Sequence, residues 1–143
     1  MTYEIVSKRQ KNHAVPVLSP ADAFNLLQRY RNARQEQFLV ITLDGAHKPI
    51  TISLACIGLV NRTLIHPREV FIRAIQDMAT AIIVCHNHPS GSLRVSPEDT
   101  EITEQLCTAG ELLGIRVVDH IIFTNTGYMS LRAEGYYKPR KEE

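Results

Sequence analysis

Hydrophobic residues gather along this chain into short runs that are separated by polar and glycine-containing turns. Near-continuous apolar runs of this length are typical of strands that are buried in a sheet. Asp44-Gly45 lies between the first two runs and predicts a turn, so these two runs are expected to pair as a hairpin. The runs that predict strands span residues 38–43, 49–57, 63–65, 81–86, 116–123 and 128–130.

Three other segments repeat their apolar residues at helical spacing. Ser19 and Ser96 are each followed by a proline and, three residues on, by Asp22 and Asp99, a pattern typical of a helix N-terminus. The remaining helix is expected to begin at residues 66–69. The residues expected to face the core are Ala23, Leu26, Leu27 and Tyr30, then Val70, Phe71, Ala74, Ile75 and Met78, and finally Ile102, Leu106, Ala109 and Leu113.

The order of these elements predicts the fold class. A helix, paired strands, a helix, a strand, a helix and further strands imply one mixed sheet flanked by helices. The expected class is therefore α/β (α+β) in a single domain, since 143 residues suffice for one core. Residues 18–135 are predicted to form this domain, residues 1–17 an N-terminal arm and residues 136–143 a charged tail.

Composition and charge limit the expected partners. The net charge is +1, so no strong attraction to nucleic acid or to a membrane surface is expected. No apolar stretch is long enough to span a bilayer, and the first residues lack the apolar core of a signal peptide. Cys56, Cys85 and Cys107 are widely spaced and form no CxxC pair, which favours buried, reduced thiols and a cytoplasmic protein.

The strongest chemical signal comes at the end of the run at residues 81–86. On an extended backbone His86 and His88 point to the same side, about 6.6 Å apart. They can converge on one ion at roughly 2.0–2.1 Å per nitrogen. Asp99, in the first turn of the next helix, can supply a third, anionic ligand. Three protein ligands leave a fourth position for water, as in catalytic zinc sites.

A simple helix cap is the alternative explanation for Ser96 and Asp99. Ser19 and Asp22 form the same pattern with no histidine nearby in the sequence. The short sequence separation between His88 and Ser96 favours a metal site shared with the histidines instead of a simple cap. A loop of that length can fold back and bring the helix start beside the histidines.

The spacing H-x-H-P-x6-S-x2-D resembles the JAMM signature of the JAB/MPN metallopeptidases. It is formed here by His86, His88, Pro89, Ser96 and Asp99. The resemblance implies a cytidine-deaminase-like JAB/MPN architecture and one Zn²⁺ per chain, held by His86, His88 and Asp99. It also implies a hydrolase that cleaves a peptide or isopeptide bond through a metal-activated water.

Three further segments are similar to the RadC branch of that family, at residues 66–71, 86–91 and 119–122. The resemblance covers about residues 15 to 135. RadC proteins commonly carry an N-terminal helix-hairpin-helix domain, which is not found in this sequence. The chain is therefore expected to resemble the short, single-domain form.

The resemblance implies roles for residues outside the metal ligands. Glu36 falls at the position of the family's general acid/base, and Glu69 is the rival, although the first turn of a helix explains Glu69 well. Ser96 is implied to stabilise the oxyanion. Asp119 and His120 either support the metal ligands or form a structural pair at a sheet edge.

A second hypothesis is a DNA-repair-associated binding or interaction module whose metal site is structural or vestigial. The RadC name carries a link to DNA repair. The near-neutral charge and the missing helix-hairpin-helix domain argue against direct nucleic-acid binding by this chain. The expected partner is therefore a protein or peptide substrate whose identity the sequence does not specify.

Overall fold

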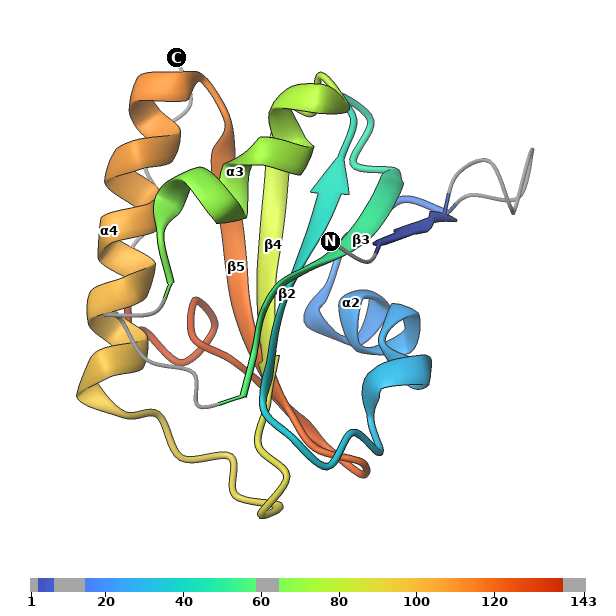
Figure 1. Cartoon of the computed structure of the whole chain (residues 1–143), viewed down its shortest axis with the longest axis vertical. Coiled ribbons are helices and arrows are strands. Elements are labelled where there is room, and N and C mark those ends of the chain that lie inside the picture. Colours follow the sequence, from blue (N-terminus) through green and yellow to red (C-terminus); the bar gives the residue numbers. More distant parts are fainter. Residues whose placement is uncertain (1–2, 7–14, 59–64, 138–143) are drawn as a thin grey trace.

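The computed structural model describes residues 3–6, 15–58 and 65–137 (Figure 1). These residues form one mixed sheet with helices on both faces, which confirms the α/β (α+β) prediction. The strands are β1 (Tyr3–Ile5), β2 (Gln37–Leu43), β3 (Pro49–Ile57), β4 (Ala81–Asn87), β5 (Arg116–Phe123) and β6 (Tyr128–Ser130). The helices are α2 (Pro20–Leu26), the 3-10 helix η2 (Gln28–Tyr30), α3 (Pro67–Gln76) and α4 (Pro97–Leu113).

The strands follow the order β1-β3-β2-β4-β5-β6 across the sheet. β2 and β3 pair antiparallel, which confirms the hairpin predicted around Asp44-Gly45. β4 and β5 pair in parallel, and α4 makes the crossover between them. Because a parallel crossover leaves from the carboxyl end of its first strand, α4 begins near the end of β4.

Two layers of side chains enclose the sheet. Helices α3 and α4 lie against one face and α2 lies against the other (Figure 1). Successive residues of the central strands alternate between the layers, so Phe38 and Val84 pack with α3 and α4, while Leu39 and Cys85 pack with α2. All seven residues of β4 are buried because both faces are covered, which explains its continuous apolar run.

Both predicted Ser-Pro helix starts are confirmed. The Oγ of Ser19 accepts a hydrogen bond from the backbone N–H of Asp22 (3.2 Å), and the Oγ of Ser96 accepts one from Asp99 (3.1 Å). At its other end α4 stops at Gly114, whose φ of 72° is a left-handed conformation that suits glycine.

The ends of the described chain are packed more closely than the sequence predicts. β1 pairs with β3, and Val6 and Val17 are buried, so parts of the expected arm over residues 1–17 contribute to the core. Tyr137 is buried as well, although it falls in the expected tail over residues 136–143. Val6 and Val17 pack in the layer that contains α2, and Tyr137 packs in the layer that contains α3 and α4.

Three residues expected in the core are exposed, namely Ile75, Met78 and Leu113. α3 ends before Met78, which has a φ of 53°, and Ile75 stays on the solvent side of that helix. At the end of α4 the chain reverses at Gly114, so Ile115 takes the core position that Leu113 was expected to fill. The expected core residues Ala23, Leu27, Val70, Phe71, Ala74, Ile102 and Leu106 are buried, and Leu26, Tyr30 and Ala109 are half-buried.

Smaller expectations have mixed outcomes. The strand expected near residues 63–65 lies partly outside the described residues, and Ile65 is buried but belongs to no strand. Cys85 and Cys107 are buried as expected, whereas Cys56 is half-buried. Within the described segments, no helix combines the length and the apolar character needed to cross a membrane.

The contact between the end of α4 and the chain that follows it leaves no room for a side chain at Gly110. A Cβ there would overlap the carbonyl oxygen of Ile115 and lie 3.3 Å from the ring of Phe71. We expect Gly110→Ala to lower the net free energy of unfolding by about 1–3 kcal/mol, even though alanine has a helix propensity about 1 kcal/mol more favourable than that of glycine. Urea denaturation measures the change. Gly45→Ala, whose Cβ meets nothing within 4 Å, is the control, and a more stable Gly110→Ala variant would contradict this packing.

Candidate metal centre

His86 and His88 meet at the carboxyl end of β4. His86 is buried and is paired with Phe38 of β2 and Ile122 of β5. His88 continues the parallel ladder, because its backbone N–H donates to the carbonyl of Phe123 (2.9 Å). The extended backbone turns both rings to the face covered by α4, and their Nε2 atoms lie 2.8 Å apart.

Asp99 reaches the same point from the first turn of α4, where it is buried. Its Oδ2 accepts a hydrogen bond from the backbone N–H of Ser96 (2.8 Å) as part of a capping box. Its Oδ1 lies 3.4 Å from Nε2 of His86. At the matching start of α2, Asp22 uses its Oδ2 to cap the N–H of Leu18. Asp99 therefore serves as a helix cap with one oxygen and faces the histidines with the other.

A chain of hydrogen bonds determines which nitrogen of His86 carries the proton. The hydroxyl of Thr103 donates its one hydrogen to the carbonyl of Asp99 (2.7 Å). Nδ1 of His120 must therefore donate to that hydroxyl (2.6 Å), and Nε2 of His120 accepts from Nδ1 of His86 (3.0 Å). With its proton on Nδ1, neutral His86 presents a bare lone pair at Nε2.

His88 is held in the same tautomer by a different partner. Its Nδ1 lies 2.8 Å from the carbonyl oxygen of Ser92, which can only accept a hydrogen bond, so Nδ1 carries the proton. The Nε2 lone pairs of His86 and His88 consequently face each other across 2.8 Å. Two acceptors at that distance repel unless a cation lies between them, and this is the arrangement that a metal site requires.

The three donor atoms could hold a metal ion. One ligand atom each from His86, His88 and Asp99 lies within 4.8 Å of the others. Bonds of 2.0–2.1 Å in a tetrahedral zinc site separate neighbouring ligand atoms by about 3.3 Å, close to the 3.4 Å between His86 and Asp99, whereas the 2.8 Å between the two histidine nitrogens is shorter. Two imidazole nitrogens and one carboxylate oxygen are a donor set that Zn²⁺ accepts, and they leave a fourth position open.

Burial favours the neutral form of the His86 and His120 imidazoles. It lowers the pKa of His86 from its ordinary 6.5 to about 4, although the charge of Asp99 acts in the opposite direction. Burial and the neighbouring His86 and His88 hold the pKa of His120 well below its ordinary value. Neutral imidazoles are the form that binds a metal ion, so His86 needs to lose no proton at neutral pH.

Glu36, the predicted acid/base, lies immediately before β2 and is half-buried. Phe38 pairs with His86, so the same register carried two residues further sets Glu36 opposite His88. Residues that oppose each other in antiparallel strands share a face of the sheet. The register therefore places Glu36 on the face of the sheet toward which the side chains of the two histidines point.

The side chain of Asn87 ties this segment to the histidine strand. Its Oδ1 accepts a hydrogen bond from the backbone N–H of Gln37 (2.6 Å), and its Nδ2 donates to the carbonyl of Gln35 (3.0 Å). Glu36 lies between these two bonds, and its own carbonyl accepts from the N–H of Gly58 (2.8 Å). The backbone on either side of Glu36 is therefore fixed relative to the metal ligands.

Glu69, the rival for the acid/base role, belongs to a different place. It lies in the first turn of α3 and near Cys56 of β3, where its charge adds to burial in raising the pKa of that thiol. The group of potential metal ligands in the described chain contains His86, His88 and Asp99 and neither Glu36 nor Glu69. Its position fits the ordinary preference for an acid at a helix start.

The capping bond of Ser96 leaves its hydroxyl hydrogen available. Oγ accepts from the N–H of Asp99, and an acceptor role uses only a lone pair. The half-buried side chain can therefore cap α4 and donate a hydrogen bond to another group at the same time.

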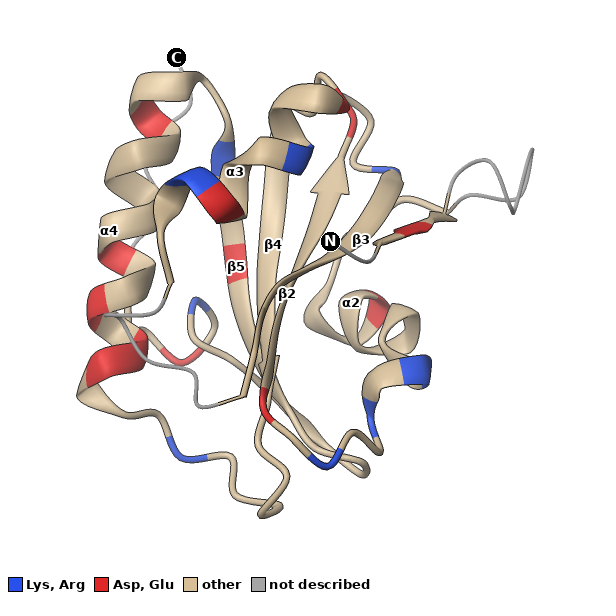
Figure 2. Cartoon of the chain, in the orientation of Figure 1, with Lys and Arg blue, Asp and Glu red and all other residues tan. Residues whose placement is uncertain are grey.

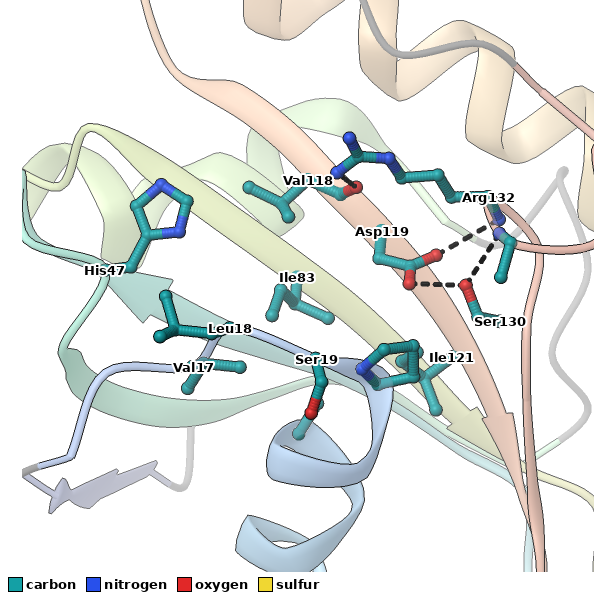
Figure 3. Close-up of a pocket in the computed structure, with 13 residues that line it drawn as sticks. Val17, Leu18, Ser19, His47, Ile83, Val118, Asp119, Ile121, Ser130 and Arg132 are labelled. Atoms are coloured by element: carbon teal, nitrogen blue, oxygen red, sulfur yellow. Dashed lines mark hydrogen bonds between the residues drawn. The ribbon is translucent and has the colours of Figure 1, made fainter.

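Asp119 and His120 have separate roles, although the sequence offered them as a pair. His120 contacts the candidate metal ligand His86. The carboxylate of Asp119 accepts hydrogen bonds from Oγ of Ser130 (2.6 Å) and from the backbone N–H groups of His120 (2.7 Å) and Arg132 (3.2 Å). Burial nevertheless raises its pKa. Figure 3 shows Asp119 with Ser130 and Arg132 at the wall of a 460 Å³ pocket that none of the three metal ligands lines.

Thr103 and Asn87 were not predicted to take part in this site. Thr103 lies one helical turn after Asp99, a spacing that could have indicated a shared face of α4. Asn87 lies between the two histidines, and in a strand its side chain is expected to point away from them. Its role depends on the pairing with β2, which no local pattern reveals.

Comparison with known proteins assigns this arrangement to a family. The family model described as the RadC-like JAB domain matches residues 17–136. The chain belongs to the RadC-like JAB domain family. Relatives named UPF0758 protein include one from Caldanaerobacter subterraneus, 45% identical over 122 residues (85% of this chain and 52% of the relative). Another, from Staphylococcus haemolyticus, is 43% identical over 133 residues, which is 92% of this chain and 58% of the relative.

A third relative, from Methanospirillum hungatei, is 52% identical over 102 residues, or 71% of this chain and 45% of the relative. It too carries the name UPF0758 protein. This RadC-like JAB domain therefore spans about half the length of the relatives that it matches.

The hydrogen bonds that link Thr103 through His120 to His86 can be tested without a substrate. His120→Phe keeps a buried ring but leaves Nδ1 of His86 without an acceptor, so we expect zinc affinity to fall about 10–100-fold. Thr103→Val, which keeps the shape and removes the hydroxyl, should lower the affinity by a smaller factor. Competition with a chromogenic zinc chelator measures both.

Exposed His66 provides the matched control, since His66→Gln changes a histidine outside the site. Thermal denaturation of the metal-free variants establishes that each remains folded. Zinc affinity equal to that of the wild type in both His120→Phe and Thr103→Val would show that this chain of hydrogen bonds does not set the state of His86.

Proposed function

We propose that this RadC-like JAB domain is a zinc-dependent hydrolase of the JAMM type that cleaves a peptide or isopeptide bond. The observation that supports it best is the convergence of the Nε2 atoms of two imidazoles with one carboxylate oxygen. His86, His88 and Asp99 form a three-ligand group, and catalytic zinc sites use three protein ligands where structural sites use four.

Zn²⁺ held by these residues supplies a Lewis acid and lowers the pKa of a coordinated water to roughly 7. The surrounding residues keep that donor set rigid. The capping box holds Asp99, the carbonyl of Ser92 orients His88, and His120 orients His86. Fixed ligands need no rearrangement during the reaction, which is how a preorganised site gains its rate.

Glu36 is the general acid/base in this proposal. Its carboxylate accepts a proton from the attacking water as the oxygen adds to the amide carbon. The same proton then passes to the leaving nitrogen as the carbon–nitrogen bond breaks. The register opposite His88 and the two bonds from Asn87 support this role, because they hold the backbone at Glu36 close to the metal ligands.

Ser96 stabilises the negative charge that develops on the amide oxygen. Its hydroxyl hydrogen is not used by the capping bond, and the N-terminus of α4 adds a positive dipole at the same position. The expected partner is a protein or peptide, and a reducing compartment such as the cytoplasm suits the buried thiol of Cys85.

Metal content and a base-free variant together test the hydrolase. Purified without a histidine tag, the wild type should contain one zinc per chain by elemental analysis, and His88→Ala should contain little. Cleavage of a peptide library should then fall about 100-fold or more in Glu36→Gln, which keeps its zinc. Absence of zinc even after reconstitution would contradict the proposal and favour an interaction module. Equal cleavage by Glu36→Gln would reject Glu36 as the base.

The two Ser-Pro helix starts allow the roles of Ser96 to be separated. Ser96→Ala and Ser19→Ala each remove a cap and should each cost about 1 kcal/mol of stability. Only Ser96→Ala should also lower kcat, by about 100-fold, with zinc retained. Cleavage rates that are the same in the two variants would show that Ser96 acts only as a cap.

A further inference from the structure

A second feature of this end of the sheet is a polar pocket of about 340 Å³ beside His88. Its walls are Arg31, Asn32 and Arg34 from the loop between η2 and β2, His88 and Pro89 from the end of β4, and Asn125 from the β5–β6 turn. We call it the arginine pocket after Arg31 and Arg34. It lies next to the candidate metal centre, because the ring of His88 belongs to both.

The charge of the arginine pocket has one sign. Arg31 and Arg34 are cationic, Asn32 and Asn125 carry amide donors, and none of the described residues that line it is acidic. Figure 2 shows basic positions on the loop before β2 and on the loop after β4, at the end of the sheet where β4 terminates. Such a lining suits an anion, and guanidinium groups pair with carboxylates in a fixed planar geometry.

Arg31 is already held in place. Its Nη2 donates to the carbonyl of Phe24 (2.8 Å), and its guanidinium carbon lies 3.6 Å from the centre of the Phe24 ring. Its Nε is buried and has no hydrogen-bond partner in the described part of the chain. A guanidinium stacked in this way loses little freedom when it binds a ligand, so it favours a specific anion over loose counterions.

From this lining we infer that the arginine pocket binds a carboxylate of the substrate, next to the amide that is cleaved. The inference rests on the proposed hydrolase and narrows its substrates to acidic ones. The carboxylate is either an Asp or Glu side chain or the C-terminus of the chain being cut. The pocket volume is at the lower end of the range for ligand sites and suits one such group.

A nucleic-acid phosphate is the competing anion. The whole chain has a net charge of +1, whereas proteins that follow a phosphate backbone use extended basic surfaces. One small pocket with two arginines favours a single carboxylate, and a phosphate backbone is an alternative that binding measurements can exclude.

Binding of matched peptides to the zinc-loaded Glu36→Gln variant, in which cleavage is expected to fall about 100-fold or more, tests the inference separately from catalysis. Acetyl-Ala-Ala-Glu-Ala-Ala-amide is compared with the same peptide carrying Gln, and acetyl-Ala-Ala-Ala with a free C-terminus is compared with its amide. NMR titration, following the backbone signals of Arg34 and Asn125, gives each Kd. We expect at least one carboxylate peptide to bind about 10-fold more tightly than its neutral partner. The member that does so identifies the source of the carboxylate.

Arg34→Gln should remove this preference, and Arg31→Gln should reduce it. Arg94→Gln is the matched control, because Arg94 is exposed on the loop after His88 but does not line the pocket, and it should keep the preference. Equal binding of charged and neutral peptides overturns the inference. So does a preference that persists in Arg34→Gln, which would indicate a carboxylate bound directly to zinc. Tighter binding of a short oligothymidylate than of either carboxylate peptide, lost in Arg34→Gln, also overturns it.

Failure of this inference differs from failure of the hydrolase. Zinc-dependent cleavage of neutral peptides with no carboxylate preference contradicts the arginine pocket alone. An Arg34-dependent carboxylate preference in a protein that cleaves nothing supports the pocket and contradicts the hydrolase.

Discussion

The parallel pairing of β4 with β5 is the constraint on which the candidate site depends. A parallel pair needs a crossover, and the crossover helix α4 must start where β4 ends. This brings Asp99 to the histidines, Thr103 one turn further along α4, and His120 onto the strand next to His86. The buried side chains of His86, Asp99, Thr103 and His120, which come from three elements, therefore meet because of one topological unit. β2 lies beside them because Phe38, near its first residue, pairs with His86.

This cluster places four polar side chains in the protein interior. His86, Asp99, Thr103 and His120 are all buried, and buried polar groups destabilise a fold unless each finds a partner. Within this cluster the hydrogen bonds meet this requirement except between the Nε2 atoms of His86 and His88. A cation at that point would remove the one remaining repulsion, so metal binding and folding stability are expected to be linked.

Much of this organisation could be predicted from local patterns. Strand and helix positions follow from apolar runs and Ser-Pro starts. The spacing of His86, His88 and Asp99 in the sequence indicates the candidate ligand group that the fold brings together. Positions that depend on where an element ends were predicted incorrectly. Leu113 has the right helical phase for the core, but the chain reverses beside it, and Tyr137 is buried by packing that its charged surroundings did not suggest.

The supporting residues were harder to predict because they act across the sheet. His120 and Asn87 contribute through strand pairing, which depends on residues more than thirty positions away. Local sequence could indicate the ligands, because their spacing is short. It could not indicate which of Asp119 and His120 faces the histidines, since that depends on the register between β4 and β5.

The two hydrogen bonds of Asn87 also fix the register of the start of β2 against β4. The register between β2 and β3 shifts between Phe38 and Leu39, close to Glu36. A slip of one residue would turn Glu36 to the opposite face of the sheet, away from both histidines. The amide of Asn87 bonds to Gln35 and Gln37 together in only one alignment. The amide of Asn87 thus fixes the face of the sheet on which Glu36 lies.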